Sequence, residues 1–145
     1  YAMTSTAKTF AQAKAAAAAL GGYLTTVNTK AENVFLTEKF FADFGSNAIW
    51  IGANDIATED TWVWDNGTTS GDSGLTDNIC GTGCGPYSDA KWGDGTFKWN
   101  NNGSSATEPN DAGSNEDCAN ITNSNGFWND LPCTSSKYGI IEFDQ

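Results

Sequence analysis

The 145-residue sequence contains no histidine, one methionine, three prolines and only seven lysines and arginines. The missing histidine excludes catalysis by a Ser-His-Asp or Cys-His arrangement and an ordinary histidine-based zinc site. No apolar run approaches the roughly 20 residues that a membrane-spanning helix needs, so we expect no membrane insertion. No signal peptide is visible and the chain begins at Tyr1, so we expect one domain over residues 1–145, excised from a larger protein.

The scarcity of basic residues leaves a strongly negative chain. Eighteen Asp and Glu residues against seven Lys and Arg give a formal net charge of −11. Because nucleic acids and anionic membranes repel such a surface, we exclude nucleic acid as a partner. The charge is compatible with cation binding, with a salty or extracellular setting, and equally with a plain acidic surface. The positions of the acids must therefore decide between these readings.

Four cysteines allow three disulfide pairings. Cys80 and Cys84 lie four residues apart in the glycine-rich segment NICGTGCGPY, and Cys118 and Cys133 lie further along the chain. Pairing each cysteine with its neighbour is the most economical choice. Disulfides predict an oxidising compartment, so we expect an extracellular protein, secreted or at the cell surface. Reduced thiols are an alternative, and a zinc site of all four cysteines fits less well because the CxxxC pair has no matching second pair.

Two segments before residue 45 have helical character. Residues 9–20 combine high helix propensity with a capping-box pair, Thr9 and Gln12, at the start and Gly21-Gly22 at the end. Residues 31–44 contain apolar residues at roughly helical spacing, namely Val34, Leu36, Phe40, Phe41 and Phe44. The sequence therefore predicts two helices in its first part.

Short apolar segments predict the strands: YLTTV at 23–27, AIWIGA at 48–53, TWVW at 61–64 and YGIIEF at 138–143. Between Asn66 and Asn129 the chain is dominated by Gly, Ser, Thr, Asn and Asp. A structureless stretch of this length is uncommon in a compact domain unless it is functional or disordered, and its tryptophans and cysteines favour an ordered, functional region. The pattern predicts an α+β domain with two helices, small antiparallel sheets, a long loop region and both termini in one sheet.

Side-chain oxygens gather between Thr107 and Cys133, in TEPNDAGSNEDCANITNSNGFWNDLPC. Calcium takes about six to eight oxygen ligands from carboxylates, amides, backbone carbonyls and water. Glu108 and Asn110 point the same way in an extended segment, because one residue separates them. Apart from its cysteines this stretch contains no soft ligand, so a transition metal fits poorly. Taken alone, however, EPN is typical of a polar turn and WND of a hairpin turn.

Over nearly its whole length the sequence resembles a C-type lectin-like domain. AKAAAAALGGYLTTVNTKAENVFL is similar to the family's two-helix signature, and WIGA at 50–53 and WVWDNG at 62–67 are similar to its core strands. EPN at 108–110, ED at 116–117 and WND at 128–130 are similar to its calcium and sugar motifs. Each motif is short, but their joint order and spacing are hard to meet by chance. The resemblance therefore implies the family's fold and its calcium-dependent carbohydrate binding.

The resemblance implies a Ca²⁺ site with ligands from Glu108, Asn110, Glu116, Asn129 and Asp130. Two neighbouring sugar hydroxyls would bind the ion and hydrogen-bond to its ligands, since carboxylates accept and asparagine amides donate. The sugar-binding residues implied are Glu108, Asn110, Glu116 and Asn129. A cis bond before Pro109 and the order Glu-Pro-Asn imply mannose-type sugars (mannose, glucose, N-acetylglucosamine and fucose), whereas Gln-Pro-Asp would imply galactose. Glycans on cells or glycoproteins are the expected partners, with a homo-oligomer or multidomain parent supplying avidity.

The resemblance also implies a second calcium site. Asp111 and Asp117 match side-chain ligands of that site in the family. Its remaining acids come from upstream, where Asp89 and Asp94 are the candidates. The lengthened loop prevents a residue-by-residue alignment there, so the choice between these two stays open.

Two features depart from the family pattern. The family's long disulfide is absent, and Ala17 and Ile141 occupy its approximate positions, so apolar packing must replace it. The pair Cys118–Cys133 matches the family's second disulfide, whereas Cys80–Cys84 is an addition. Stability is therefore expected to depend more on the core.

The lengthened loop leaves alternatives for function. Trp92 and Trp99 lie in it and either stack on a sugar or anchor the loop, anchoring being our interpretation. A protein- or ice-binding domain of the same fold, with calcium only structuring the loops, is the alternative to carbohydrate binding. A glycosidase using Glu108 and Glu116 is a third reading. Carboxylates that hold calcium stay ionised and are poor general acids, so we expect no enzymatic activity.

Overall fold

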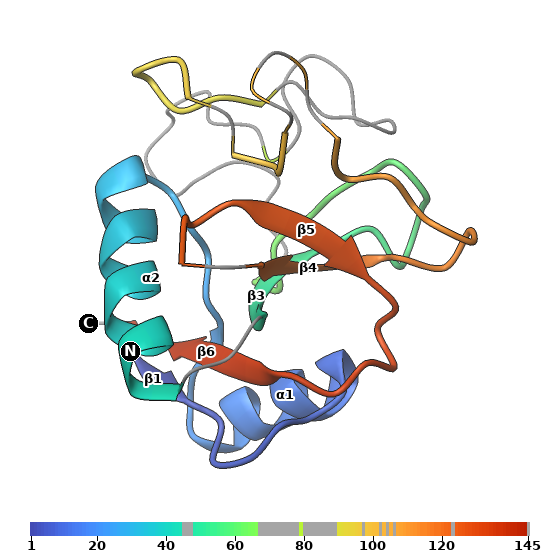
Figure 1. Cartoon of the computed structure of the whole chain (residues 1–145). Helices are drawn as coiled ribbons and strands as arrows, with labels where there is room; N and C mark the ends of the chain where they lie inside the picture. The colour runs from blue at the N-terminus through green and yellow to red at the C-terminus, as the bar shows by residue number, and fades with distance from the viewer. Residues whose placement is uncertain are drawn as a thin grey trace.

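The structure is a computed structural model that describes residues 1–44, 48–66, 79, 90–96, 98–101, 103, 105, 107–122 and 124–144. Its helices are α1 (Phe10–Ala19) and α2 (Lys30–Phe44). Its strands are β1 (Ala2–Met3), β2 (Tyr23–Leu24), β3 (Ile49–Asn54), β4 (Cys118–Ile121), β5 (Trp128–Leu131) and β6 (Tyr138–Glu142). Figure 1 shows α1 below the strands, α2 beside them, and the yellow segment around residues 90–96 at the far side from α1. The fold class expected from the sequence is thus present.

The strands form one mixed sheet in the order β1-β6-β3-β4-β5, and β2 also pairs with β6. The pair β3 and β6 is parallel, and the other strand pairs are antiparallel. This parallel pair joins the small antiparallel groups that the sequence predicts. Ala2 of β1 lies opposite Ile141 of β6, so the expectation that both termini meet in one sheet is confirmed.

Both predicted helices are confirmed with small shifts of their ends. The backbone N–H of Gln12 donates to Thr9 Oγ1 at 3.3 Å, and the backbone N–H of Thr9 donates to Gln12 Oε1 at 3.1 Å, which completes the capping box. Gly21 follows the end of α1 at a φ of 81°, a conformation that glycine adopts readily. In α2, Leu36 is buried as its spacing predicts, whereas Val34 is 42% exposed and does not face the core.

The strand predictions differ from the structure at TWVW and at β4 and β5, because WND, typical of a hairpin turn when taken alone, begins strand β5. TWVW at 61–64 forms only one isolated bridge, from Val63 to Asn54, so its assignment as a strand is wrong. Strand β4, between β3 and β5, lies inside the stretch that the sequence presents as loop. Its four residues, CANI, are too few to show a clear period, although all four are buried and both edges of the strand are paired.

Tryptophans dominate the main core. Trp62, Trp64 and Trp128 are buried in it, and Trp50 is buried in a smaller cluster with Phe10, all four as predicted. Trp128 packs edge-to-face on Trp64, Trp92 and Trp99, with ring centroids 5.6–5.8 Å apart. Trp99 is fully buried and its Nε1 donates to the Ile79 carbonyl at 2.7 Å, so Trp99 anchors the loop. The ring at the start of β5 is therefore held from several sides, two residues before Asp130.

Covalent and apolar links complete the frame. The Cys118–Cys133 disulfide is present and joins β4 to the segment after β5, as expected. The predicted Cys80–Cys84 pair lies outside the described residues. Ala17 and Ile141 are both fully buried, which agrees with apolar packing in place of the missing long disulfide. Within the described part of the chain, neither helix has the length and apolar character needed to cross a membrane.

Candidate functional site

The EPN segment runs beside the end strand of the sheet. The backbone N–H groups of Thr107 and Glu108 donate to the Asn100 carbonyl at 2.9 and 3.2 Å, and the Asn100 N–H donates to the Trp128 carbonyl at 2.8 Å. The peptide bond between Glu108 and Pro109 is cis, as the resemblance implies. The segment is thereby attached to β5 through residue 100.

Asp130 connects β5 to this segment directly. Its side chain is fully buried, and its carboxylate accepts hydrogen bonds from the backbone N–H of Asn110 at 3.0 and 3.1 Å and of Asp111 at 2.7 Å. Backbone donors can satisfy only part of a carboxylate's capacity to accept hydrogen bonds. Asp130 therefore holds the loop in place while keeping acceptor capacity for a further partner.

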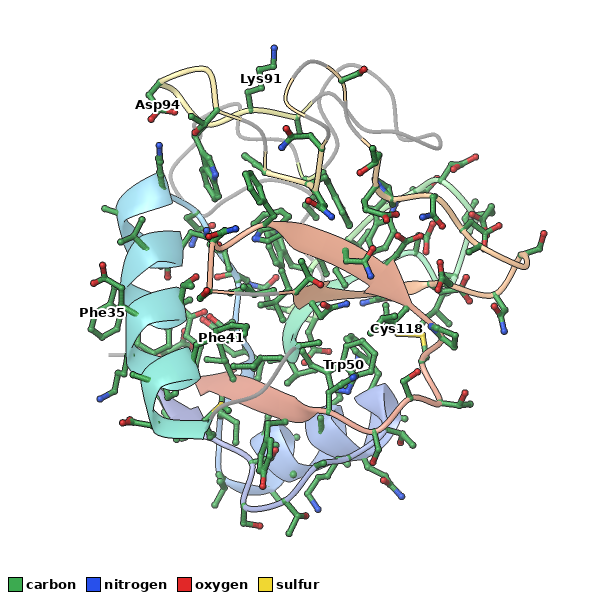
Figure 2. The ribbon with its side chains drawn as sticks, viewed as in Figure 1. Phe35, Phe41, Trp50, Lys91, Asp94 and Cys118 are labelled. Atoms are coloured by element: carbon green, nitrogen blue, oxygen red, sulfur yellow. A yellow bond between two sulfur atoms is a disulfide. The ribbon has the colours of Figure 1, made fainter. Side chains whose placement is uncertain are left out.

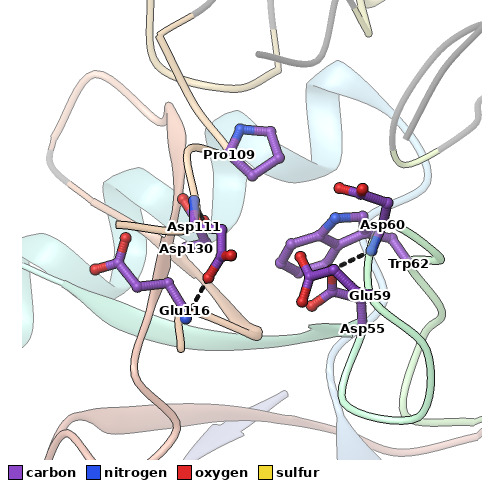
Figure 3. Close-up of a pocket in the computed structure, with 8 residues that line it drawn as sticks. All are labelled: Asp55, Glu59, Asp60, Trp62, Pro109, Asp111, Glu116 and Asp130. Atoms are coloured by element: carbon purple, nitrogen blue, oxygen red, sulfur yellow. Dashed lines mark hydrogen bonds between the residues drawn. The ribbon is translucent and has the colours of Figure 1, made fainter. Parts of the chain in front are cut away.

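Glu116 closes the same loop from its other end. Its Oε2 accepts a hydrogen bond from the Ala112 N–H at 2.8 Å, and its own N–H donates to Asp111 Oδ1 at 3.1 Å. Figure 3 shows Glu116, Asp111 and Asp130 side by side. The loop from residue 108 to 116 thus forms a tight turn that brings two of its acids to Asp130.

Asn129, another predicted ligand, is the neighbour of Asp130 in β5, and their side chains point in opposite directions. Neighbouring residues in a strand point to opposite faces, so Asn129 lies on the other face of β5. It is opposite Asn120 of β4, whose Nδ2 donates to the Asn129 carbonyl at 2.9 Å. β5 is the end strand of the sheet, and the segments that carry Asn100 and EPN run along its outer edge.

Two side-chain oxygens at the site are buried without a hydrogen-bond partner: Glu108 Oε2 and Asn110 Oδ1. A buried acceptor that lacks a donor costs about 1–3 kcal/mol, and more if it is charged. A cation coordinated by these oxygens would remove that cost. The two atoms are therefore candidate ligands for a cation.

Three carboxyl groups lie close together around the EPN loop, and the pKa of each is raised above its ordinary value. Burial raises the pKa of Glu108 to about 8, and the negative charges of Asp130 and Glu116 contribute to the rise. Burial also raises the pKa values of Asp130 and Glu116, although backbone N–H donors oppose the effect at both residues. Without a cation the site therefore holds a proton near neutral pH, and a bound cation would displace it.

A second acidic group adjoins the first. Carboxylate oxygens of Glu59, Asp111 and Asp117 lie within 4.8 Å of one another, as do those of Asp55, Glu59 and Asp60. Asp55 Oδ1 is buried without a partner, and burial raises the pKa of Asp55 to about 7. The space between the two groups has a volume of about 10 Å³, enough for one water-sized sphere (Figure 3). It is lined by Asp55, Glu59, Asp60, Trp62, Pro109, Asp111, Glu116 and Asp130.

The upstream acids beside Asp111 differ from those that the sequence suggested. Asp94 is not among them, because its exposed carboxylate pairs with Lys30 of α2. Asp89 lies outside the described residues. Asp55 and Glu59 take this place, on the turn directly after β3. The sequence feature that supplies them is the acid-rich segment DIATED, one residue after WIGA.

The raised pKa values predict opposite pH dependences with and without calcium. The metal-free folded chain binds the Glu108 proton more tightly than the unfolded chain, so this stabilisation is complete below the ordinary pKa of 4.5 and is lost as pH rises through about 8. Calcium needs the ionised groups, so its affinity should fall as pH drops from about 8 towards 5. Melting temperatures measured with calcium and with chelator should diverge as pH rises, and two parallel curves would contradict this expectation.

The fold and the site define a class: an α+β domain with an acidic, ion-sized pocket at its last strand. A sequence model of the lectin C-type domain matches residues 6–142. The chain therefore belongs to the C-type lectin domain family.

Individual proteins similar to this chain support the assignment. Lectin BRA-3 of Megabalanus rosa is 43% identical over 47 residues, which are 32% of this chain and 26% of that protein. The C-type carbohydrate-recognition domain of cow CD23, solved in the presence of a GlcNAc2Man3 oligosaccharide, is 25% identical with a TM-score of 0.64, covering 99% of this chain and 86% of that one. A calcium-independent type II antifreeze protein shares the fold at a TM-score of 0.65 and 21% identity, covering 96% of this chain and 81% of that one.

Proposed function

We propose that this chain is a calcium-dependent carbohydrate-binding domain with mannose-type specificity. The observation that carries the proposal is the pair of buried oxygens without partners, Glu108 Oε2 and Asn110 Oδ1, in a loop fastened to Asp130. A calcium ion is the partner that such oxygens fit, because it takes carboxylate and amide oxygens together. The cow CD23 domain, determined with an oligosaccharide, supports the choice of ligand.

The first ion would be held by Glu108, Asn110, Glu116, Asn129 and Asp130. Three of these are carboxylates, which leave a net charge of about −1 with Ca²⁺ bound. Asn129 would reach the ion around the outer edge of β5, along which the EPN segment runs. An ion there would tie the EPN loop to both faces of the strand.

A second ion would lie between Glu59, Asp111 and Asp117, with Asp55 beside them. Asp111 already donates its backbone N–H to Asp130, so an ion at its carboxylate would order the same loop that carries Asn110. We infer that the role of the second ion is to hold this loop in its binding shape.

Two vicinal hydroxyls of a sugar would complete the coordination of the first ion. Each hydroxyl would donate to a carboxylate, such as Glu108 or Glu116, and accept from an amide, Asn110 or Asn129. Mannose, glucose, N-acetylglucosamine and fucose offer suitable diols. A site that holds two hydroxyls is shallow, so we expect about millimolar affinity, roughly −4 kcal/mol.

Weak binding by one domain suggests how the parent protein works. Avidity from a homo-oligomer or a multidomain parent would allow it to bind glycans on cells or glycoproteins. The Cys118–Cys133 disulfide supports an extracellular location, where such glycans are displayed. Because carboxylates committed to calcium are poor general acids, we propose a binding role and no enzymatic reaction.

A glycan array probed with calcium and with chelator tests the function. We expect binding to mannose-type glycans and to a mannose resin that is much stronger in calcium than in chelator. Binding that is as strong in chelator as in calcium would contradict the proposal. The same fold occurs in a calcium-independent type II antifreeze protein. No glycan hit, with a melting temperature that calcium still raises, would favour the protein- or ice-binding alternative.

A further inference from the structure

A second cavity lies near the end of β5 opposite to Asp130. Its volume is about 140 Å³, far larger than the ion pocket. The walls come from the first turns of α2, from the loop around residues 92–96 and from the turn before β5. The lining residues are Lys30, Asn33, Val34, Trp92, Thr96, Asn125, Gly126 and Phe127.

An aromatic ring held from two sides forms one wall. Trp92 is 5% exposed and packs edge-to-face on Trp128, with ring centroids 5.6 Å apart. The ammonium Nζ of buried Lys98 lies 4.7 Å from the centre of the Trp92 ring, a cation–π distance. Because these contacts fix the ring, a ligand that packs on it would not pay to order it.

The back of the cavity is equally rigid. Asn33 of α2 is buried; its Nδ2 donates to the Gly126 carbonyl at 2.8 Å and its Oδ1 accepts from Trp128 Nε1 at 2.9 Å. A Cβ at Gly126 would lie 2.8 Å from Asn33 Nδ2, so the turn fits closely against the helix. The cavity thus keeps its shape without a ligand.

The mouth of the cavity is polar and almost neutral. Lys30 forms an ion pair with Asp94, and Thr96 Oγ1 donates to Asp94 Oδ1 at 2.6 Å. Asp94, labelled in Figure 2, and Thr96 are exposed, Lys30 is partly exposed, and Val34, 42% exposed, borders them. An apolar interior below a hydroxyl and a balanced pair of charges suits a neutral, amphipathic ligand better than an anion.

We propose that this cavity is a second sugar subsite, which takes one pyranose ring without calcium. A cavity of about 150 Å³ in another protein holds a single benzene ring, so this cavity has the size of one six-membered ring. The apolar C–H face of a pyranose would pack on Trp92 and Phe127, and its hydroxyls would face Lys30, Asp94 and Thr96. The proposal extends the proposed carbohydrate binding but depends on none of the residues at the ion.

A nitrogen-15 NMR titration with methyl α-mannoside, in chelator, tests the subsite. We expect saturable shifts of the Trp92 indole and of the Gly126 and Phe127 amides. Val34→Phe should fill the mouth and weaken this binding by about tenfold or more. Ala42→Phe is the matched control, since it adds the same ring at an exposed position elsewhere on α2 and should change nothing.

The outcomes separate this subsite from the ion site. Asn110→Ala, titrated with calcium, should lose calcium-dependent binding and keep the cavity shifts. Cavity residues that do not respond to the sugar, or respond equally in Val34→Phe, would overturn the subsite and leave the ion site standing. Shifts caused by phenol but not by the sugar would identify an apolar side-chain pocket and would also overturn it.

Discussion

Asp130→Asn should abolish calcium-dependent sugar binding and lower calcium affinity by about 100-fold, or about 2.8 kcal/mol. The substitution keeps the size of the side chain but removes one of the three charges at the proposed first calcium site. It also leaves one acceptor oxygen where two now receive the backbone N–H groups of Asn110 and Asp111. Calorimetric titration of calcium and retention on a mannose resin would measure the two losses.

The matched control is Asp43→Asn, which makes the same change of charge at an exposed position of α2. It should bind calcium and sugar as the unmodified chain does. In the metal-free state Asp130→Asn relieves repulsion with Glu108 and loses one acceptor, so its free energy of unfolding should change by only about 1 kcal/mol. Calcium binding by Asp130→Asn that equals the wild type would show that β5 does not carry the ion.

Trp128→Ala should have the largest effect on stability, a loss of about 4 kcal/mol in the free energy of unfolding. Its ring is fully buried at the centre of the tryptophan cluster, in contact with Trp64, Trp92 and Trp99. The substitution leaves a large cavity and removes the donor to Asn33 Oδ1. Urea unfolding, followed by tryptophan fluorescence in saturating calcium, would measure the loss.

Phe35→Ala is the control for this substitution, because Phe35 is 48% exposed on α2 and its truncation should cost less than about 1 kcal/mol. Trp128→Phe should recover part of the stability, since it restores most of the buried ring. Unfolding midpoints for Trp128→Ala and Phe35→Ala that agree would mean that the cluster does not support the domain.

The parts of this protein that depend on neighbours in sequence are readable from the sequence. The capping box of Thr9 and Gln12 needs residues three apart, and both hydrogen bonds form. The cis bond before Pro109 lies in the EPN motif, and Asn129 and Asp130 lie in the WND motif; both motifs are short and have a recognisable order. The candidate ligands from residue 108 to 130 could be named for the same reason.

Longer-range pairing decided the rest. The end of β3 lies beside the start of β4, where the Asp55 N–H donates to the Asp117 carbonyl at 3.1 Å. This contact brings Asp55 and Glu59 to Asp111, more than 50 residues further along the chain. Local composition contains no information on which strands become neighbours, so the sequence suggests only the acids of the long loop, Asp89 and Asp94.

The sequence by itself determined the helices, the core tryptophans, the Cys118–Cys133 pair and the order of oxygens around Pro109. Only the tertiary structure decided which oxygens are buried without partners, which acids join Asp111, and that Trp92 lines a second cavity. Chain neighbours set caps, turns and motifs, whereas burial and pocket shape arise where distant segments meet. Glu108 Oε2 and Asn110 Oδ1 illustrate the difference. The EPN motif identifies these residues, but only the tertiary packing buries the two oxygens away from any hydrogen-bond donor.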